Sequence, residues 1–312
     1  MTIETLFEKV RSNLQSATYC PKKLAFLHAG VTAGVTLLFS IITHLLTGTM
    51  DTAVGLSGLD TRTTLSFIRT LLLFACTVAL PFWDLGYTRA AVRYAKGETP
   101  TPWDLLTGFR RIFPALRTML LRAVAVGILL FLSLQAATML FMLSPFRFSL
   151  TEKAEALMAA ETQLTPELFQ QILPYFVPVY LLWLVVALVL FVPLFYKYRL
   201  ADFALMDTAA GAFDAFKISA RQTNKRRLQL FKLDLHFWWY YVLGLLTVVI
   251  SYLDVLLPSV GIALNEEIFY WLFFILGQLA TLTLHTFCTP KVQTAYALFA
   301  QGAFQDRNSV VL

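Results

Sequence analysis

The sequence predicts an all-α, polytopic membrane protein with six transmembrane helices. Hydrophobic residues make up 58% of the 312 residues, charged residues make up 14%, and the mean hydropathy is +0.66. Soluble domains usually carry about 25% charged residues, so a soluble fold of this length could not bury so much apolar surface. We expect residues 1–312 to form a single membrane domain.

Six apolar segments are long enough to cross a bilayer, which requires about 20 residues of helix. The second is expected to continue past Pro81 as a kinked helix toward Tyr94, because neighbouring helices can satisfy the carbonyl that a proline frees. The predicted spans are Leu24–Leu46, Leu65–Leu85, Met119–Leu143, Tyr175–Phe195, Leu233–Leu256 and Ile268–Cys288.

The charges alternate between the two sides of these spans, and the formal net charge is +6. Lys and Arg gather in both terminal segments and in the connections after the second and fourth spans, whereas the other connections are mainly acidic. The positive-inside rule therefore places both termini in the cytosol. The residues before Leu24 include Glu4, Glu8, Lys9 and Arg11, so we expect the first apolar segment to remain as a span rather than a cleaved signal.

Three cytosolic segments, at 3–14, 103–116 and 213–220, have apolar residues at helical spacing with charged residues opposite. Each is too short to span a bilayer, so each is predicted to lie as an interfacial amphipathic helix in the headgroup plane before the next span. We call these segments elbows. The sequence 101–104, Thr-Pro-Trp-Asp, is typical of a helix start.

The sequence therefore predicts three elbow-plus-hairpin pseudo-repeats, at roughly 1–97, 98–207 and 208–312. A shift of 110 positions pairs Arg89 with Arg199 and Asp104 with Asp214 without gaps. Two spans per unit would make the repeats parallel, around an axis along the membrane normal. The outer loop, 144–174, is expected to carry short helices, one at 151–162 and another starting at Thr165.

Five ionisable residues in the apolar segments form a hypothetical polar ring near the cytosolic ends of the spans. Charged groups at membrane depth are costly and often functional, so this ring could hold a substrate or a proton. The alternative is that they anchor helices at the interface. No pair of histidines has i, i+3 or i+4 spacing, so we expect no metal site. The residues are His28, Asp84, Asp234, His236 and His285.

A second set combines basic and aromatic residues that could contact lipid headgroups. The segment 217–232 is basic, and beside a bilayer its expected partner is anionic lipid rather than nucleic acid. The aromatic run 237–241 fits an interfacial belt, with an aromatic cage for a lipid headgroup or a cationic ligand as the alternative. The predicted headgroup contacts are Arg110, Arg111, Arg117, Arg226, Arg227, Trp238 and Trp239.

Motifs of common enzymes are missing from the sequence. It contains no H-E-x-x-H, G-x-S-x-G, Walker A or G-x-G-x-x-G pattern, and we expect no cofactor. Cys20, Cys76 and Cys288 form no CxxC pair, which favours structural cysteines. Ser219 with His236 is the nearest pair that could serve as nucleophile and base.

Residues 215–299 resemble a bacterial membrane-protein family catalogued as domain of unknown function 975. The resemblance rests on Ala215, Ser219, the run 231–237, and Pro290 with the following Ala297 and Phe299; Gly86-Tyr87 and Gly108-Phe109 fit the family's first cytosolic connection. The departures include His236 in place of a serine and Asn224 or Lys225 in place of a glycine. The resemblance implies an integral plasma-membrane protein and brings no catalytic residues.

Three hypotheses about function follow. The first is a non-enzymatic plasma-membrane protein that interacts with anionic membrane lipids or with an unidentified membrane protein. The second is a small-solute transporter or channel that uses the polar ring. The third is a membrane-embedded enzyme, which would require Ser219 and His236 to be in contact.

Overall fold

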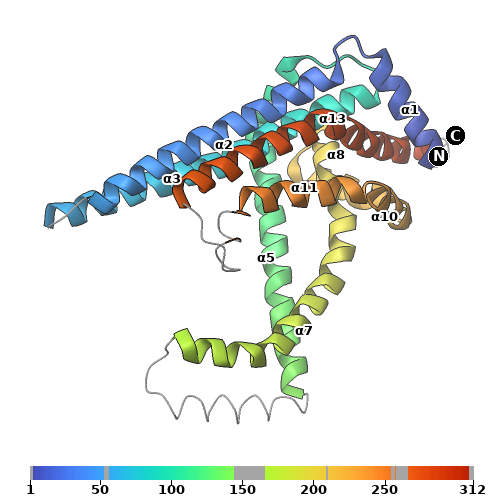
Figure 1. Ribbon diagram of the computed structural model, residues 1–312. Coiled ribbons are helices and arrows are strands. Elements are labelled where there is room, and N and C mark those ends of the chain that lie inside the picture. The colour runs from blue at the N-terminus through green and yellow to red at the C-terminus, as the bar shows by residue number, and fades with distance from the viewer. Residues whose placement is uncertain are drawn as a thin grey trace. The chain divides into compact units, whose positions relative to one another are not determined.

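The computed structural model describes residues 3–52, 56–143, 166–208, 210–253, 257 and 266–308. Within these ranges every regular element is a helix, and no strand occurs (Figure 1). The chain divides into two compact units: unit 1 comprises Met1–Ala115 with Leu200–Leu312, and unit 2 comprises Leu116–Arg199. Their limits differ from those of the predicted pseudo-repeats, so the repeat organisation stays a prediction.

The described residues contain five helices that are long and apolar enough to cross a membrane. They are Pro21–Thr47, Thr63–Ala95, Ile112–Leu143, Tyr180–Asp207 and Ile268–Gly302. The pair Arg227–His236 and Trp238–Ser251 passes the same test together but is bent by 57°. The protein thus has the helices of a multi-pass membrane protein, with six spans if the bent pair counts as one.

Unit 1 contains most of the helices. Near its N-terminus lie α1 (Ile3–Ser16), α2 (Pro21–Thr52) and α3 (Leu56–Ala95), and α3 continues across Pro81 as predicted. The other helices of the unit are η1 (Pro102–Leu106), α4 (Thr107–Arg110), α8 (Ala201–Asp207), α9 (Ala212–Thr223), α10 (Arg227–His236), α11 (Trp238–Ser251) and α13 (Glu266–Asn308).

The core of unit 1 forms where α3, α8 and α13 pack against one another. Small side chains allow this close approach. The buried residues are Ala90, Ala91 and Ala95 of α3, Ala201 and Ala204 of α8, and Ala295, Ala297 and Ala300 of α13. The N-terminal elbow α1 packs against α13, and its Asn13 Nδ2 donates hydrogen bonds of 3.0 Å to the carbonyls of Tyr94 and Ala95.

The elbow after α3 begins at Thr101 as predicted, and its first turn is the 3-10 helix η1. The Thr101 amide donates to Asp104 Oδ2 at 2.6 Å, which completes a capping box. Trp103 and Phe113 are 69% and 72% exposed. These large apolar side chains therefore face outward, as an interfacial helix requires.

Two glycines bring this elbow into backbone contact with α3. A Cβ atom on Gly86 would lie 1.8 Å from the carbonyl oxygen of Leu105, and one on Gly108 would lie 1.8 Å from that of Phe82. No side chain fits at either position, so the contact is backbone against backbone on both sides. It fixes the connection between the second and third spans.

The predicted segment 213–220 lies within α9. The next helix, α10, is the first part of the bent pair, and it is joined to α9 through Lys225, a residue with φ of 63°. The buried face of α9 includes Ala212, Ala215 and Ser219, while Phe213 is 65% exposed. The predicted fifth span, Leu233–Leu256, falls on a helix pair that is bent by 57° between α10 and α11.

Unit 2 consists mainly of α5 (Ile112–Leu143), of which it includes the part from Leu116, and α7 (Pro166–Tyr198). Since α7 is continuous, the short helix expected to start at Thr165 and the fourth span are one element. The indole of Trp183 donates to Ser133 Oγ at 3.0 Å, a polar contact between apolar helices. The helix predicted at 151–162 lies outside the described residues.

Gly86 and Gly108 give a direct test of the backbone contact. G86A or G108A should destabilise the folded protein by about 1–3 kcal/mol, because the added methyl group meets a carbonyl that cannot move independently. G30A is the matched control, since a Cβ at Gly30 meets nothing within 4 Å. Thermal unfolding in detergent should show a lower midpoint for the first two variants and no decrease for G30A.

Candidate functional site

His28 of α2 and Asp84 of α3 form the first contact of the predicted polar ring. His28 Nε2 lies 3.1 Å from Asp84 Oδ1, an ion-pair distance that lacks hydrogen-bond geometry. The His28 side chain is 7% exposed, whereas the Asp84 side chain is 63% exposed. The pair therefore joins a buried imidazole to a carboxylate that faces outward.

Aromatic residues of α3 hold the His28 ring in place. The Trp83 ring is stacked on it at a centroid distance of 5.7 Å, and the Tyr87 ring lies 4.8 Å away. The Trp83 indole N–H also donates to the backbone carbonyl of His28 at 3.0 Å. Neither Trp83 nor Tyr87 was predicted to belong to the polar ring; the signal for them is that they lie one residue before and three residues after Asp84 on the same helix.

His285 of α13 belongs to the same neighbourhood. It interacts electrostatically with His28 and Asp84. Its Nδ1 lies 3.2 Å from Thr289 Oγ1, which in turn lies 3.1 Å from the hydroxyl of Tyr240 on α11. Side chains of α2, α3, α11 and α13 thus converge on one polar, aromatic cluster. We call it the Asp84 cluster: His28, Trp83, Asp84, Tyr87, Tyr240, His285 and Thr289.

Asp234 and His236 have other neighbours. The Tyr241 and Tyr296 hydroxyls both donate to Asp234 Oδ1, and the two hydroxyl oxygens lie 2.8 Å apart. This network ties α10 and α11 to α13 across the bend. The His236 ring packs 4.3 Å from the Phe7 ring of α1. Of the five residues of the predicted polar ring, His28, Asp84 and His285 therefore belong to one cluster. Asp234 and His236 lie instead at the bend between α10 and α11.

Arg111, which was predicted as a headgroup contact, is bound to carbonyl oxygens of its own chain. Its guanidinium donates to the carbonyls of Leu205, Thr208 and Ala210, the last two at 2.7 and 2.8 Å. These carbonyls end or follow α8, where the helix dipole favours a cation. Burial, with a smaller contribution from Arg89, lowers the pKa of Arg111 from its ordinary value.

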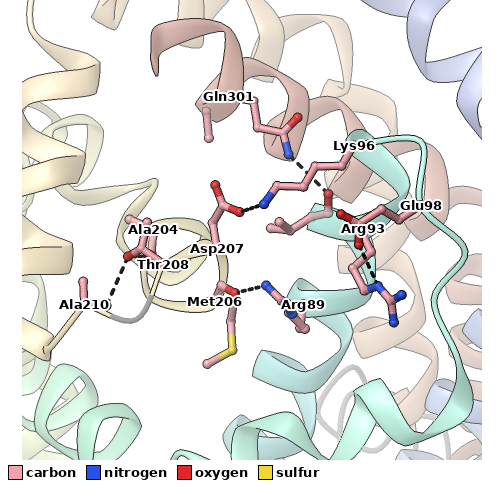
Figure 2. Close-up of polar contacts among 12 residues, drawn as sticks. Arg89, Arg93, Lys96, Glu98, Ala204, Met206, Asp207, Thr208, Ala210 and Gln301 are labelled. Atoms are coloured by element: carbon pink, nitrogen blue, oxygen red, sulfur yellow. Dashed lines mark hydrogen bonds and ion pairs between the residues drawn. The ribbon is translucent and has the colours of Figure 1, made fainter. Parts of the chain in front are cut away.

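Basic residues at the end of α3 and just after it also make polar contacts, two of them with α8 (Figure 2). Arg89 Nη1 donates to the carbonyl of Met206 at 2.6 Å, and Lys96 Nζ pairs with Asp207 Oδ1 at 2.5 Å. Arg93 pairs with Glu98 at 3.0 Å and with Asp104 at 2.7 Å. These cations therefore link α3 to the end of α8 and to the segment that follows α3.

Five of the seven predicted headgroup contacts are exposed side chains: Arg110, Arg117, Arg227, Trp238 and Trp239. Arg226 is half-buried and has a partner within the protein. The most exposed of the aromatic pair is Trp238, at 59%. Exposure is what a headgroup contact requires, so these five stay as predictions.

The residues proposed for catalysis have separate environments. Ser219 is completely buried, and its Oγ accepts a hydrogen bond from the Leu200 amide at 3.2 Å. His236 is exposed and packs against Phe7. Within the described part of the chain, no group of three or more His, Cys, Asp or Glu side chains is arranged to hold a metal ion. The geometry offers no support for a nucleophile–base pair.

Comparison with known proteins found no matching family model, curated protein or solved structure. The resemblance to the family catalogued as domain of unknown function 975 therefore stays a prediction.

Arg111 and its neighbour Arg110 allow a matched test of the α8 junction. R111Q should lower the free energy of unfolding by about 2 kcal/mol or more, because it leaves half-buried carbonyls without their charged donor. R110Q removes the same charge from an exposed position and should change stability by less than about 0.5 kcal/mol. Hydrogen exchange at residues 204–210 should accelerate in R111Q alone; equal exchange in both variants would contradict the assignment.

Proposed function

We propose that this chain is a non-enzymatic, multi-pass protein of the bacterial plasma membrane that binds anionic lipid headgroups through the elbow formed by α9 and α10. In this proposal both termini lie in the cytosol, as the distribution of Lys and Arg indicates. The observation that carries it is the mixture of exposed cations and exposed large apolar side chains on residues 212–236.

The apolar part of this surface is unusually large for short helices. Phe213 of α9 is 65% exposed, and on α10 Leu228 is 66%, Phe231 47% and Leu235 58% exposed. In water these side chains would be unfavourably hydrated. At a membrane interface they would enter the boundary between headgroups and acyl chains, as in other interfacial helices.

The charged part has the sign that anionic lipid requires. Residues 212–236 contain six Lys or Arg and two Asp, and Asp234 is already bound by two tyrosine hydroxyls. A Lys or Arg near an anionic surface contributes about 1 kcal/mol of attraction. The exposed cations of the elbow are Lys217, Arg221, Lys225, Arg227 and Lys232.

Buried contacts hold the elbow in position. Leu230 and Leu233 of α10 are 0% and 1% exposed, and Ser219 of α9 is 0% exposed. Because these residues pack inward, the outward residues keep one arrangement. A fixed surface loses less conformational entropy on binding than a flexible tail does, which favours the elbow as the lipid contact.

Removing four elbow cations tests this function. K217Q/R221Q/R227Q/K232Q should lower the preference for phosphatidylglycerol over phosphatidylcholine by at least about tenfold, as four contributions of about 1 kcal/mol would allow. Native mass spectrometry of the protein released from mixed micelles can measure the bound lipid.

The matched control is K9Q/R11Q/K22Q/K23Q, which removes four exposed cations from α1 and α2. Here the large apolar residues Leu6 and Val10 of α1 are buried, so this variant should retain most of the preference. If both quadruple variants lose the preference equally, total charge is responsible and the elbow is not a site.

The second candidate function is that of a small-solute transporter or channel. It is favoured by the Asp84 cluster, in which four helices contribute polar groups around an exposed carboxylate. Such groups on membrane-spanning helices commonly mark a substrate or ion path.

Water access at Asp84 tests the second candidate. In a variant without Cys20, Cys76 and Cys288, D84C should react with a charged, membrane-impermeant thiol reagent at least tenfold faster than L71C. Leu71 is 56% exposed on the same helix and suits a lipid-facing position. Equal rates would mean that position 84 faces lipid, and the transport candidate would then be abandoned.

A further inference from the structure

Asp84 is an exposed carboxylate on a helix that is apolar enough to span a membrane. Among the described residues its ion-pair partner is His28, and no Lys or Arg side chain lies within ion-pair distance. The Asp84 side chain is 63% exposed and its contact with His28 lacks hydrogen-bond geometry, so the carboxylate can accept further hydrogen bonds. Carboxylates in such segments are costly unless they are paired, so this one is suited to an external cation.

The neighbours of Asp84 are mainly hydrogen-bond acceptors and aromatic rings. The hydroxyls of Tyr240 and Thr289 can each accept, as can an imidazole nitrogen of His285. Both Tyr240 and His285 lie within electrostatic reach of the Asp84 carboxylate. Aromatic rings near a carboxylate further favour a cation through their negative faces.

We propose that the Asp84 cluster binds a primary ammonium group, with the Asp84 carboxylate as its counter-ion. This rests on the second candidate function and names the chemical class of its ligand. An R–NH3+ group has three N–H donors, which match the carboxylate and the nearby hydroxyl and imidazole acceptors. A quaternary ammonium has no such donor, and the described residues include no set of side chains suited to a metal ion.

Two sources could present this group: the ethanolamine headgroup of a phospholipid, or a small amine dissolved in the cytosol. In both, the ammonium would pair with Asp84 at the edge of the cluster, while His28 stays buried between α2 and α3. The cationic elbow is a separate surface with the opposite charge, so the two can be tested independently.

The experiment has two arms, both with the full chain. In the first, native mass spectrometry compares phosphatidylethanolamine with phosphatidylcholine bound to wild type, D84N and D84E. In the second, calorimetry titrates ethylammonium or tetramethylammonium into protein in phosphatidylglycerol nanodiscs. A charge-assisted hydrogen bond contributes about 1.5–3 kcal/mol, so D84N should weaken binding of the primary amine by at least about tenfold.

The matched control is D214N, which neutralises an exposed aspartate of α9 outside the cluster. D214N should bind as wild type does, and D84E, which keeps the charge, should retain a preference for the primary amine even if D84N folds poorly. A preference in the first arm alone assigns the lipid headgroup, and one in the second arm assigns a soluble amine. If wild type prefers the primary amine in neither arm, or D84N binds equally well, the proposal is wrong.

Discussion

The close packing of alanine-rich stretches of α3, α8 and α13 is the constraint on which unit 1 depends. Lipid is as apolar as a leucine side chain, so the hydrophobic effect gives little reason for spans to associate, and close packing with hydrogen bonds must hold them. Ala201 of α8 and Ala295 of α13 are completely buried. The candidate lipid surface and the Asp84 cluster both belong to this unit.

The second constraint is the end of α8, where carbonyl groups need donors. Arg89 and Arg111 supply them, and Lys96 neutralises Asp207 beside them. A helix C-terminus attracts cations because its carbonyl dipoles align, so basic residues are used there for folding. The number of Lys and Arg residues in a basic loop therefore overstates the positive charge available to lipid. Side-chain exposure distinguishes the residues that can contact lipid from those that stabilise the fold.

The sequence predicted the long helices well because length and apolar composition alone decide them, and it predicted the elbow start at Thr101 from its capping residues. It missed the break at Phe237, since apolar residues continue on both sides of it. It also could not separate Arg110 from Arg111. The helix α4 ends at Arg110, and Arg111 leaves it with φ of −111° and ψ of 39°, which turns one guanidinium inward and leaves its neighbour exposed.

Two carboxylates on apolar helices, Asp84 and Asp234, looked equivalent in the sequence but have different surroundings. Asp234 accepts hydrogen bonds from Tyr241 and Tyr296, so its charge is satisfied by the fold, and its role is to fix the bend between α10 and α11. Asp84 meets an imidazole on one side and remains open on the other. The orientation of each helix about its own axis decides which carboxylate meets hydrogen-bond donors, and that orientation follows from packing rather than from composition. Hydrogen bonds within the protein stabilise the carboxylate of Asp234, and Asp84 is the carboxylate for which we propose a ligand.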